Sequence, residues 1–363
     1  MTPLAFLVPG RLDQVTGGYL YDRRIVEGLR AAGRRIEVVE LAGNHQPVAD
    51  PAARRAVSAA LAELPEGSAV VLDGLVLAAA ETCLPAASRR LRLIAFVHHP
   101  LALETGLSRG EGERLAALER RLLPLMCGII CPSRVTATAL AAYGVPLARI
   151  AVVPPGTDKP PAPAGRRGSG PARLLTVATV TPRKGHLLAA AALAGLAGLD
   201  WSWLCVGSLS RDRQTSQALA AAVGRDGLAG RVTLAGEWPP ERLPEAYMAA
   251  DCFLLPSYHE GYGMAFAEAL AQGLPIVAAR AGAVPELVPP GAGLLVPPGD
   301  AAALGGALRR ILTEPGLRAR LAAGAAAAGA ALPDWTTSVR RWGEAFDRLA
   351  AALPAVSAGP QPI

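Results

Sequence analysis

The sequence predicts an α/β protein with two domains, each built around a parallel sheet. Its 363 residues are more than one ordinary hydrophobic core holds, and they suit two domains of about 150–180 residues each. Short apolar runs closed by proline or glycine recur along the chain, which is typical of parallel strands buried on both faces. Segments with the apolar spacing of helices lie between these runs.

The first domain is expected over residues 1–160. It opens with a strand at 4–8, and a helix at 19–32 follows with one apolar face. Ser133, at the end of a later strand, is placed to cap a helix that starts at Val135. The other expected elements are strands at 36–39, 69–73, 93–97 and 128–133, a helix at 111–124, and a closing segment at 150–158.

A linker and a second domain follow. Residues 161–172 are rich in Pro, Gly, Ser and Arg and indicate a linker, and the second domain is expected over 173–333. Apolar residues recur at helical spacing from Trp335 to Leu349, which predicts a terminal helix over 334–353. Strands of the second domain are expected at 174–178, 201–207, 232–236, 252–256 and 276–279, with a strand and turn at 293–300.

The charge distribution argues against nucleic acid as a partner. The net charge of +6 is divided almost evenly between the two halves of the chain, and no basic arm or stripe is interleaved with aromatic residues. The excess is compatible with anionic small molecules or with a loose membrane-surface contact. The sequence gives no oligomeric state.

Cysteine usage and the N-terminus favour a cytoplasmic location. The five cysteines form an odd set without disulfide or metal-finger spacing, so we expect buried free thiols in a reducing compartment. The start of the chain lacks the pattern of a signal peptide. No apolar run reaches the ~18–20 residues that span a bilayer.

The most informative stretch is residues 258–277, which reads as loop, helix and strand after a buried strand. Gly261 and Gly263 let the loop backbone approach a ligand, and the first helix amides point N–H groups and the positive end of the helix dipole at it. Glu260 lies in the loop and Glu268 in the helix, so we expect both carboxylates to face one crevice. Such a site suits an anion or a ligand rich in hydroxyl groups.

Glu260 and Glu268, with seven residues between them, resemble the Glu-x7-Glu motif of the retaining GT-B glycosyltransferases of the large family 4 type, also called group 1. The resemblance implies the GT-B fold, with two Rossmann-like domains facing each other across a deep cleft. It implies an acceptor-binding first domain, a nucleotide-sugar-binding second domain and a terminal helix that crosses back to the first. In that family the first glutamate lies beside the donor sugar, and the second binds the ribose.

Arg183, Lys184 and Gly185 form a second specific site, directly after a predicted strand. Two cations and the amides of a helix start are suited to a diphosphate. The family usually has an arginine where this chain has Thr179, and Arg183 is placed to supply that charge. The resemblance covers nearly the whole chain, but only this site and the Glu260–Glu268 region are specific.

Other residues resemble the family less specifically. The spacing of Gly10, Gly17 and Gly18 excludes a dinucleotide fingerprint, but Gly17 and Gly18 resemble paired glycines that meet the donor diphosphate, the alternative being a tight turn. His98, after a strand, resembles a histidine near the reacting sugar carbon. Trp238 is placed to stack on the base or to pack. The implied donor-binding residues are Gly17, Gly18, Arg183, Lys184, Gly236, Trp238, Glu260, Gly261, Tyr262, Gly263, Met264 and Glu268, and the implied catalytic residues are His98, Glu260, Arg183 and Lys184.

The expected chemistry is hexosyl transfer without metal or cofactor. The chain has no Asp-x-Asp, the motif with which the other main glycosyltransferase class holds a metal ion, and Arg183 with Lys184 could stabilise a leaving diphosphate instead. Retention is implied by the resemblance. Because no carboxylate is an obvious nucleophile, we favour a front-face route in which the departing phosphate helps to deprotonate the acceptor and His98 orients the reacting groups.

Three alternatives remain at this point. A nucleotide-sugar 2-epimerase of the same fold would turn over the donor without any acceptor. A catalytically silent scaffold would bind nucleotide without hydrolysis or transfer. An NAD-dependent oxidoreductase fits worst, since no fingerprint loop is present. The sequence leaves the acceptor unknown, and UDP and GDP sugars both stay open as donors.

Overall fold

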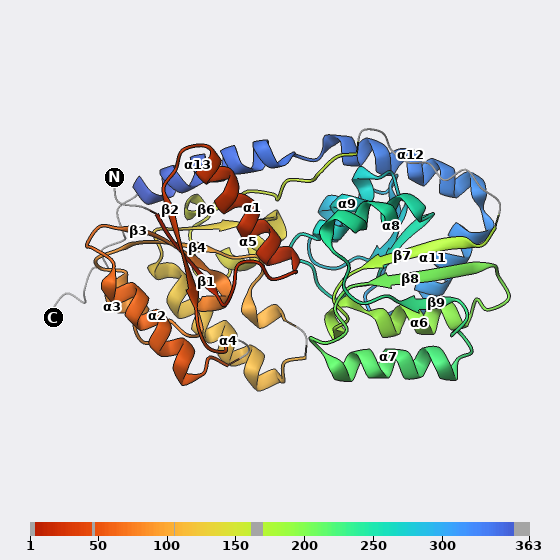
Figure 1. Ribbon diagram of the computed structural model, residues 1–363, viewed down its shortest axis with the longest axis horizontal. Helices are drawn as coiled ribbons and strands as arrows, with labels where there is room; N and C mark the ends of the chain where they lie inside the picture. Colours follow the sequence, from red (N-terminus) through yellow and green to blue (C-terminus); the bar gives the residue numbers. More distant parts are fainter. Residues whose placement is uncertain (1–3, 46–47, 105, 161–169, 352–363) are drawn as a thin grey trace. The chain divides into compact units, whose positions relative to one another are not determined.

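The computed structural model describes residues 4–45, 48–104, 106–160 and 170–351. The chain separates into two compact units, one comprising residues 1–156 and 335–363 and the other residues 157–334. Each unit holds a six-stranded parallel sheet flanked by helices (Figure 1). Most of the predicted linker, residues 161–169, and the end of the predicted terminal helix, from residue 352, lie outside the described residues.

The first unit contains a sheet with the strand order β2-β1-β3-β4-β5-β6. Its strands are β1 (Leu4–Pro9), β2 (Ile36–Leu41), β3 (Ala69–Asp73), β4 (Arg92–Phe96), β5 (Gly128–Cys131) and β6 (Ile150–Val152). Its α-helices are α1 (Gly17–Ala31), α2 (Pro51–Glu63), α3 (Leu84–Ala87), α4 (Arg109–Leu122), α5 (Arg134–Ala141) and α13 (Trp335–Ala351). Short 3-10 helices are η1 (Gly74–Val76), η2 (Leu101–Leu103), η3 (Leu123–Leu125) and η4 (Leu147–Arg149).

The second unit contains a sheet with the order β12-β11-β10-β7-β8-β9. Its strands are β7 (Ala172–Val177), β8 (Trp201–Val206), β9 (Val232–Leu234), β10 (Cys252–Leu255), β11 (Ile276–Ala279) and β12 (Gly293–Val296). Its α-helices are α6 (His186–Ala194), α7 (Arg213–Arg225), α8 (Leu243–Ala249), α9 (Met264–Ala271), α10 (Val284–Leu287), α11 (Ala301–Thr313) and α12 (Pro315–Ala331). Its 3-10 helices are η5 (Pro182–Lys184) and η6 (Pro240–Arg242).

Both sheets have a point at which the strand order reverses direction. In the first unit this point lies between β1 and β3, and in the second between β7 and β10. Ligands of open parallel sheets bind beyond the carboxyl ends of the strands at such a point. The topology therefore directs attention to the loops after β1 and β3 and to those after β7 and β10.

The predicted strands are present, with small differences at their ends. The strand predicted at 128–133 ends at Cys131, because Pro132 has no N–H to donate to the ladder. Ser133 caps the next helix as predicted, since its Oγ accepts from the Thr136 N–H at 3.1 Å, but that helix begins at Arg134 rather than at Val135. All five cysteines are free, and four of them are buried.

The terminal helix α13 packs against α1, β4 and β5 in the first unit (Figure 1). Trp342 is fully buried, and its ring lies 5.6 Å from that of Phe96. Gly28 of α1 leaves room for this contact, because a Cβ there would lie 2.4 Å from Val339 Cγ2. Among the described residues, no helix combines the length and hydropathy needed to cross a bilayer.

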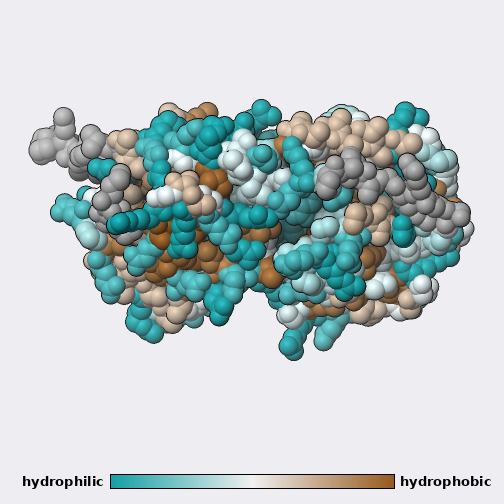
Figure 2. Space-filling view, turned by 45° about the horizontal axis from the view of Figure 1, so that its top comes forward, coloured by the Kyte–Doolittle hydropathy of each residue, from teal (hydrophilic) through white to brown (hydrophobic). Residues whose placement is uncertain are grey.

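Helix α12 fixes the position of α9 in the second unit. A Cβ at Gly329 would lie 2.2 Å from the Leu270 carbonyl oxygen, and one at Gly324 would lie 1.9 Å from that of Gly291. Gly329 therefore allows α12 to approach α9 closely, and Gly324 allows it to approach the loop before β12. Figure 2 shows a weakly hydrophobic band over α12, whose exposed positions are mostly alanine.

Candidate functional site

The site in the second unit centres on Glu260, in the loop after β10. Its side chain is 6% exposed, and Oε1 accepts from Lys184 Nζ at 2.7 Å and from Ser257 Oγ at 2.6 Å. Arg183 Nη1 lies 3.6 Å from Oε2. Burial opposes the charged carboxylate, but Lys184 and Arg183 outweigh it and lower the pKa of Glu260. Lys184 and Arg183, which were predicted to bind a diphosphate, thus form one ion cluster with Glu260.

Lys184 reaches this cluster from the loop after β7. Residues 182–184 form the turn η5, and Gly185 ends it with φ of +71°. A Cβ at Gly185 would lie 2.3 Å from the Pro256 carbonyl oxygen, so only glycine lets this turn lie against the end of β10. Because β7 and β10 flank the reversal of strand order, the cluster lies where the topology places a ligand.

Gly282, in the loop after β11, holds the Glu260 backbone from a third side. Its φ is +53°, and an added Cβ would lie 2.2 Å from the Glu260 carbonyl oxygen. The next amide, that of Ala283, donates to the same oxygen at 2.8 Å. Three loops that are distant in the sequence therefore fix one carboxylate.

Helix α9 begins beside the cluster, directly after Gly263. Gly263 has φ of +99°, and no side chain caps the helix there. The amides of its first turn can therefore meet a negatively charged group. The buried hydroxyl of Tyr262 has no hydrogen-bond partner within the described ranges, which leaves it as a further polar group of this loop. Gly261, next to Glu260, is buried, and Met264 is the first residue of the helix.

Glu268 belongs to a second set of contacts. Its Oε2 accepts from the hydroxyl of Tyr247, a buried residue of α8, at 2.6 Å. Burial and the Glu268 carboxylate raise the pKa of Tyr247 well above its usual range, so the hydroxyl stays a donor. The sequence offered no signal for Tyr247, which has the spacing of a core aromatic residue. Its contact sets the orientation of the Glu268 side chain.

Gly236 and Trp238 follow β9 in the same unit. Gly236 has φ of +69°, and its carbonyl oxygen accepts from the Gly207 N–H at 2.9 Å. Trp238 is half-buried and packs on the core beneath α8 and β10, and the Arg242 guanidinium lies 3.7 Å from its ring centre. Trp238 thus packs on the core, and the Arg242 guanidinium covers one face of its ring.

The site residues of the first unit gather around His98. Its Nε2 lies 3.0 Å from Asp22 Oδ1 and 4.0 Å from Asp73 Oδ2. Burial alone would lower the pKa of His98, but Asp22 and Asp73 raise it to about 9. A Cβ at Gly18 would lie 3.2 Å from His98 Cδ2, so this glycine makes room for the imidazole. Gly17 is the first residue of α1, which no side chain caps.

Sequence reasoning missed both aspartates. Asp73 is the last residue of a buried strand, at the edge where parallel sheets bind ligands, and that position was a usable signal. Asp22 lies within α1, where nothing distinguished it. Asp22, Asp73 and His98 form the one group of three among the described residues that could hold a metal ion.

Glu119 of α4 fixes the loop that follows His98. Its carboxylate is fully buried and accepts from the Leu101 N–H at 2.7 Å and the Ala102 N–H at 3.2 Å. Burial raises the pKa of Glu119 to about 7, against the effect of these two amides. One buried acid, Glu119, therefore fixes the backbone of the loop that follows His98.

This burial predicts a pH dependence of stability. The pKa of Glu119 is raised from 4.5 to about 7 on folding, so its contribution is full below the lower value and is lost as pH rises through the upper one. Between these limits wild type should lose up to about 3 kcal/mol, at about 1.4 kcal/mol per pKa unit. Urea unfolding at both pH limits measures this slope. Glu119→Gln should lose less stability than wild type by this amount, since the other shifted groups are unchanged. Glu113→Gln, on the exposed face of α4, should match wild type, and equal slopes in all three would contradict the assignment.

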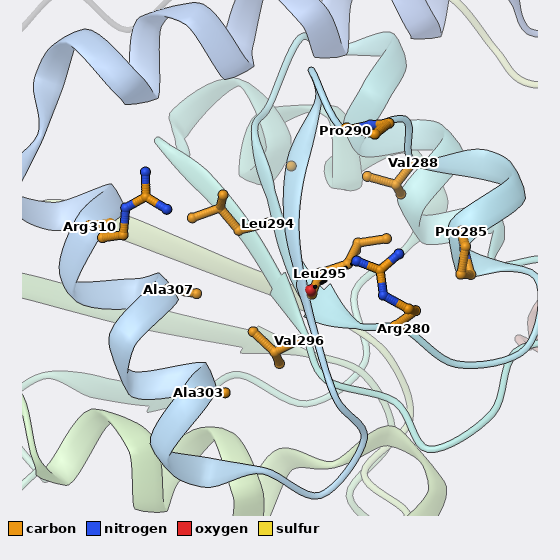
Figure 3. A pocket seen from close by; sticks show the side chains of 11 residues that line it. Arg280, Pro285, Val288, Pro290, Leu294, Leu295, Val296, Ala303, Ala307 and Arg310 are labelled. Carbon is orange, nitrogen blue, oxygen red and sulfur yellow. Dashed lines mark hydrogen bonds between the residues drawn. The ribbon is translucent and has the colours of Figure 1, made fainter.

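A cavity of about 490 Å³ lies elsewhere in the second unit, between β12 and α11. Figure 3 shows Arg280 and Arg310 on opposite sides of a lining that is otherwise mostly apolar, including Leu294 and Ala307. None of the residues predicted to bind a donor lines it. Its lining lacks the acidic and amide groups that a polyhydroxylated ligand needs, so the Glu260 cluster is the better candidate site.

Two family models match the chain over most of its length. Residues 171–314 match the group described as glycosyl transferases group 1, and residues 18–159 match glycosyltransferase family 4. The chain belongs to the family 4 glycosyltransferases. Its two sheets, each with flanking helices, are the two Rossmann-like domains of the GT-B fold.

Individual relatives agree with this family 4 assignment. The D-inositol 3-phosphate glycosyltransferase of Acidothermus cellulolyticus is 36% identical over 202 residues, which are 51% of this chain and 45% of that protein. The chain spans about half the length of the curated relatives it matches. Among solved structures, sucrose-phosphate synthase from Thermosynechococcus elongatus has a TM-score of 0.81 at 23% identity and covers 97% of this chain and 100% of its own. Anabaena HepE in complex with UDP and glucose has a TM-score of 0.73 at 20% identity, with 96% and 100% covered.

Proposed function

We propose that this protein transfers a hexosyl group from a nucleotide-diphosphate sugar to an acceptor hydroxyl. The observation that carries the proposal is the buried cluster of Glu260, Lys184 and Arg183 at the reversal point of the second sheet. Family membership supports it, as does the glycosyltransferase activity named for the Acidothermus relative. An epimerase is the less favoured alternative, because the relative is named as a transferase.

The cluster suggests how a donor would be held. Lys184 and Arg183 supply the positive charge that a diphosphate needs, and the first amides of α9 add N–H donors. Glu260 keeps the lysine ammonium in place and offers its carboxylate to the hydroxyl groups of the sugar. Glu268, oriented by Tyr247, accepts from the ribose hydroxyl groups.

Catalysis would consist mainly of stabilising the leaving diphosphate. Charge that develops on the departing phosphate would be met by groups already in position, which lowers the barrier without reorganisation. We propose retention by a front-face route without a metal ion, with His98 orienting the reacting groups. We expect NMR to show that the product keeps the anomeric configuration of the donor sugar. We also expect the rate to be unchanged in EDTA.

UDP is the preferred nucleotide of this proposal. The supporting observation is that HepE, a protein of the same fold, is held in complex with UDP and glucose. GDP sugars stay the competing donor class. The acceptor is unassigned, and D-inositol 3-phosphate is the first compound to test because it is named for the relative.

The test is release of nucleoside diphosphate from UDP-glucose and GDP-mannose in EDTA, with and without candidate acceptors. Acceptor-dependent release with formation of a glycoside supports the proposal. Donor turnover without any acceptor would instead favour the epimerase alternative. Nucleotide binding without turnover, over a broad acceptor panel, would favour a silent scaffold.

Tyr247→Phe should weaken nucleotide binding less than loss of Glu268 itself. The substitution removes one hydroxyl and its 2.6 Å bond to Glu268 Oε2, while the ring keeps its place in the core. A hydrogen bond to a charged group contributes about 1.5–3 kcal/mol, which is about 10- to 150-fold in affinity. Because Glu268 itself remains, we expect a loss near the lower end, roughly tenfold, by calorimetry. An unchanged affinity would show that Tyr247 does not orient the carboxylate for the ligand.

A further inference from the structure

Two buried aspartates lie behind His98 in the first unit. Asp22 projects from α1 and is 0% exposed, and Asp73 ends β3 and is 1% exposed. Both face the imidazole, at 3.0 Å and 4.0 Å from Nε2. Neither carboxylate has a function in the proposed donor site, so this arrangement needs its own explanation.

Burial and mutual repulsion oppose a charge on both carboxylates, because one oxygen of each lies within 4.8 Å of the other. Their side chains lie within hydrogen-bonding reach, and burial together with Asp22 raises the pKa of Asp73 well above its usual range. Asp22 Oδ2 is buried without any donor among the described residues. A proton on Asp73 Oδ2 would supply that donor, because Asp73 Oδ1 already accepts from the Leu75 N–H at 2.7 Å.

Asp22 is the acid nearer to His98, and its Oδ1 contacts the imidazole. Other groups packed on the imidazole are the rings of Tyr21, at 5.9 Å, and Phe96, at 4.7 Å. The Tyr21 hydroxyl donates to the Val153 carbonyl oxygen, so it has its own acceptor. The titratable groups that face His98 within the described part of the chain are thus Tyr21 and the two aspartates.

We propose that Asp22 and Asp73 are positioning residues that share one proton and hold His98 as a cation through neutral pH. The Nε2–H donates to Asp22, which leaves Nδ1–H as the donor for a ligand. The catalytic consequence of this inference rests on the proposed function. In that function His98 would donate a hydrogen bond toward the reacting groups and would not act as a general base. Its structural content can be tested without any turnover.

The test is NMR titration of the histidine Cε1–H signals of the full chain between about pH 5 and 10, the range that brackets ordinary imidazole and the raised value. The chain has five histidines, and the signal absent from His98→Gln identifies His98. EDTA is present in these titrations and is left out only of a separate sample to which Zn²⁺ is added. The variants are Asp22→Asn, Asp73→Asn and, as a control, Asp347→Asn, which removes an exposed charge from the same unit.

The expected midpoint for His98 is about 9 in wild type and in Asp347→Asn. Asp22→Asn should lower it by about two pH units or more, the effect of losing a contacting charge. Asp73→Asn should lower it by less than Asp22→Asn does, because Asp73 lies 4.0 Å from Nε2 against 3.0 Å for Asp22 and an aspartate that carries the shared proton contributes less charge. The other four histidine signals report whether each variant remains folded.

Several results would overturn the proposal. A wild-type midpoint at or below about 6.5, the ordinary value, would show that His98 is not held as a cation. An equal shift in Asp22→Asn and Asp73→Asn would show that the proton is not on Asp73. Loss of the His98 titration on adding Zn²⁺, restored by EDTA, would show that the three side chains form a metal site instead. If the midpoints are as expected but no donor is turned over, the proposed function fails while the inference stands.

Discussion

Replacing Lys184 by methionine should lower donor turnover by roughly 10²–10³-fold, the effect of removing one group that stabilises transition-state charge. The lysine Nζ lies 2.7 Å from Glu260 Oε1, in position to meet a diphosphate. Methionine keeps most of the apolar stem of the side chain but not the charge. The measurement is the steady-state rate of nucleoside diphosphate release from the preferred donor.

The chain offers a matched control for this substitution, because Lys159 is its one other lysine. Its Nζ donates to the Ala330 carbonyl oxygen at 2.8 Å, on an exposed part of the same unit. Lys159→Met should retain the wild-type rate. If Lys184→Met also retained it, the cluster would have no part in catalysis and another site would have to be found.

Gly282→Ala should disrupt the same site through the backbone. The new Cβ would lie 2.2 Å from the Glu260 carbonyl oxygen, so the loop after β11 or the loop that carries Glu260 must move. We expect a loss of about 3 kcal/mol or more in the free energy of unfolding, from the left-handed backbone and the clash together. Donor binding should be lost with it.

Gly227→Ala separates the two contributions. Gly227 has φ of +70° in the same unit, but an added Cβ meets nothing within 4 Å. This control carries only the conformational penalty of about 1–2 kcal/mol. Urea unfolding of both variants gives the difference, and equal losses would contradict the close packing of the two loops at Glu260.

The fold was largely accessible from the sequence, because buried parallel strands have a strong local pattern. Residues 69–73 and 276–279 were predicted as strands with the bounds that the structure has. Pro132 shortened the strand predicted to end at Ser133, and this reason was itself readable in the sequence. The order of strands in each sheet is not a local property, and so the reversal points became visible only in the structure.

The site was accessible as a set of residues but not as a set of contacts. The motif predicted Glu260, Lys184 and Arg183, but their pairing joins positions separated by 76 residues in the chain. That pairing depends on Gly185 and Gly282, whose importance comes from backbone contacts with other loops. Lys184 and Arg183 were predicted to bind phosphate, and Glu260 was predicted to bind the sugar. No spacing rule could therefore have shown that these residues contact one another.

The partners of His98 and Glu268 were missed for a related reason. Asp22 and Tyr247 are internal residues of helices, and each reaches a predicted site residue on another segment of the chain. In a single sequence such residues look like ordinary members of amphipathic helices. They are recognised only when the structure shows a polar atom turned inward toward a partner.

The most direct test of the central claim is calorimetric titration with UDP, GDP and ADP in EDTA. The account predicts that one of them binds without metal in the micromolar range, and that Glu268→Ala weakens its binding by at least about tenfold. Glu314→Ala, which removes an exposed carboxylate at the start of α12, should bind like wild type. Absence of binding to all three nucleotides, or equal binding by wild type and Glu268→Ala, would contradict the assignment of this site to a nucleotide-sugar donor.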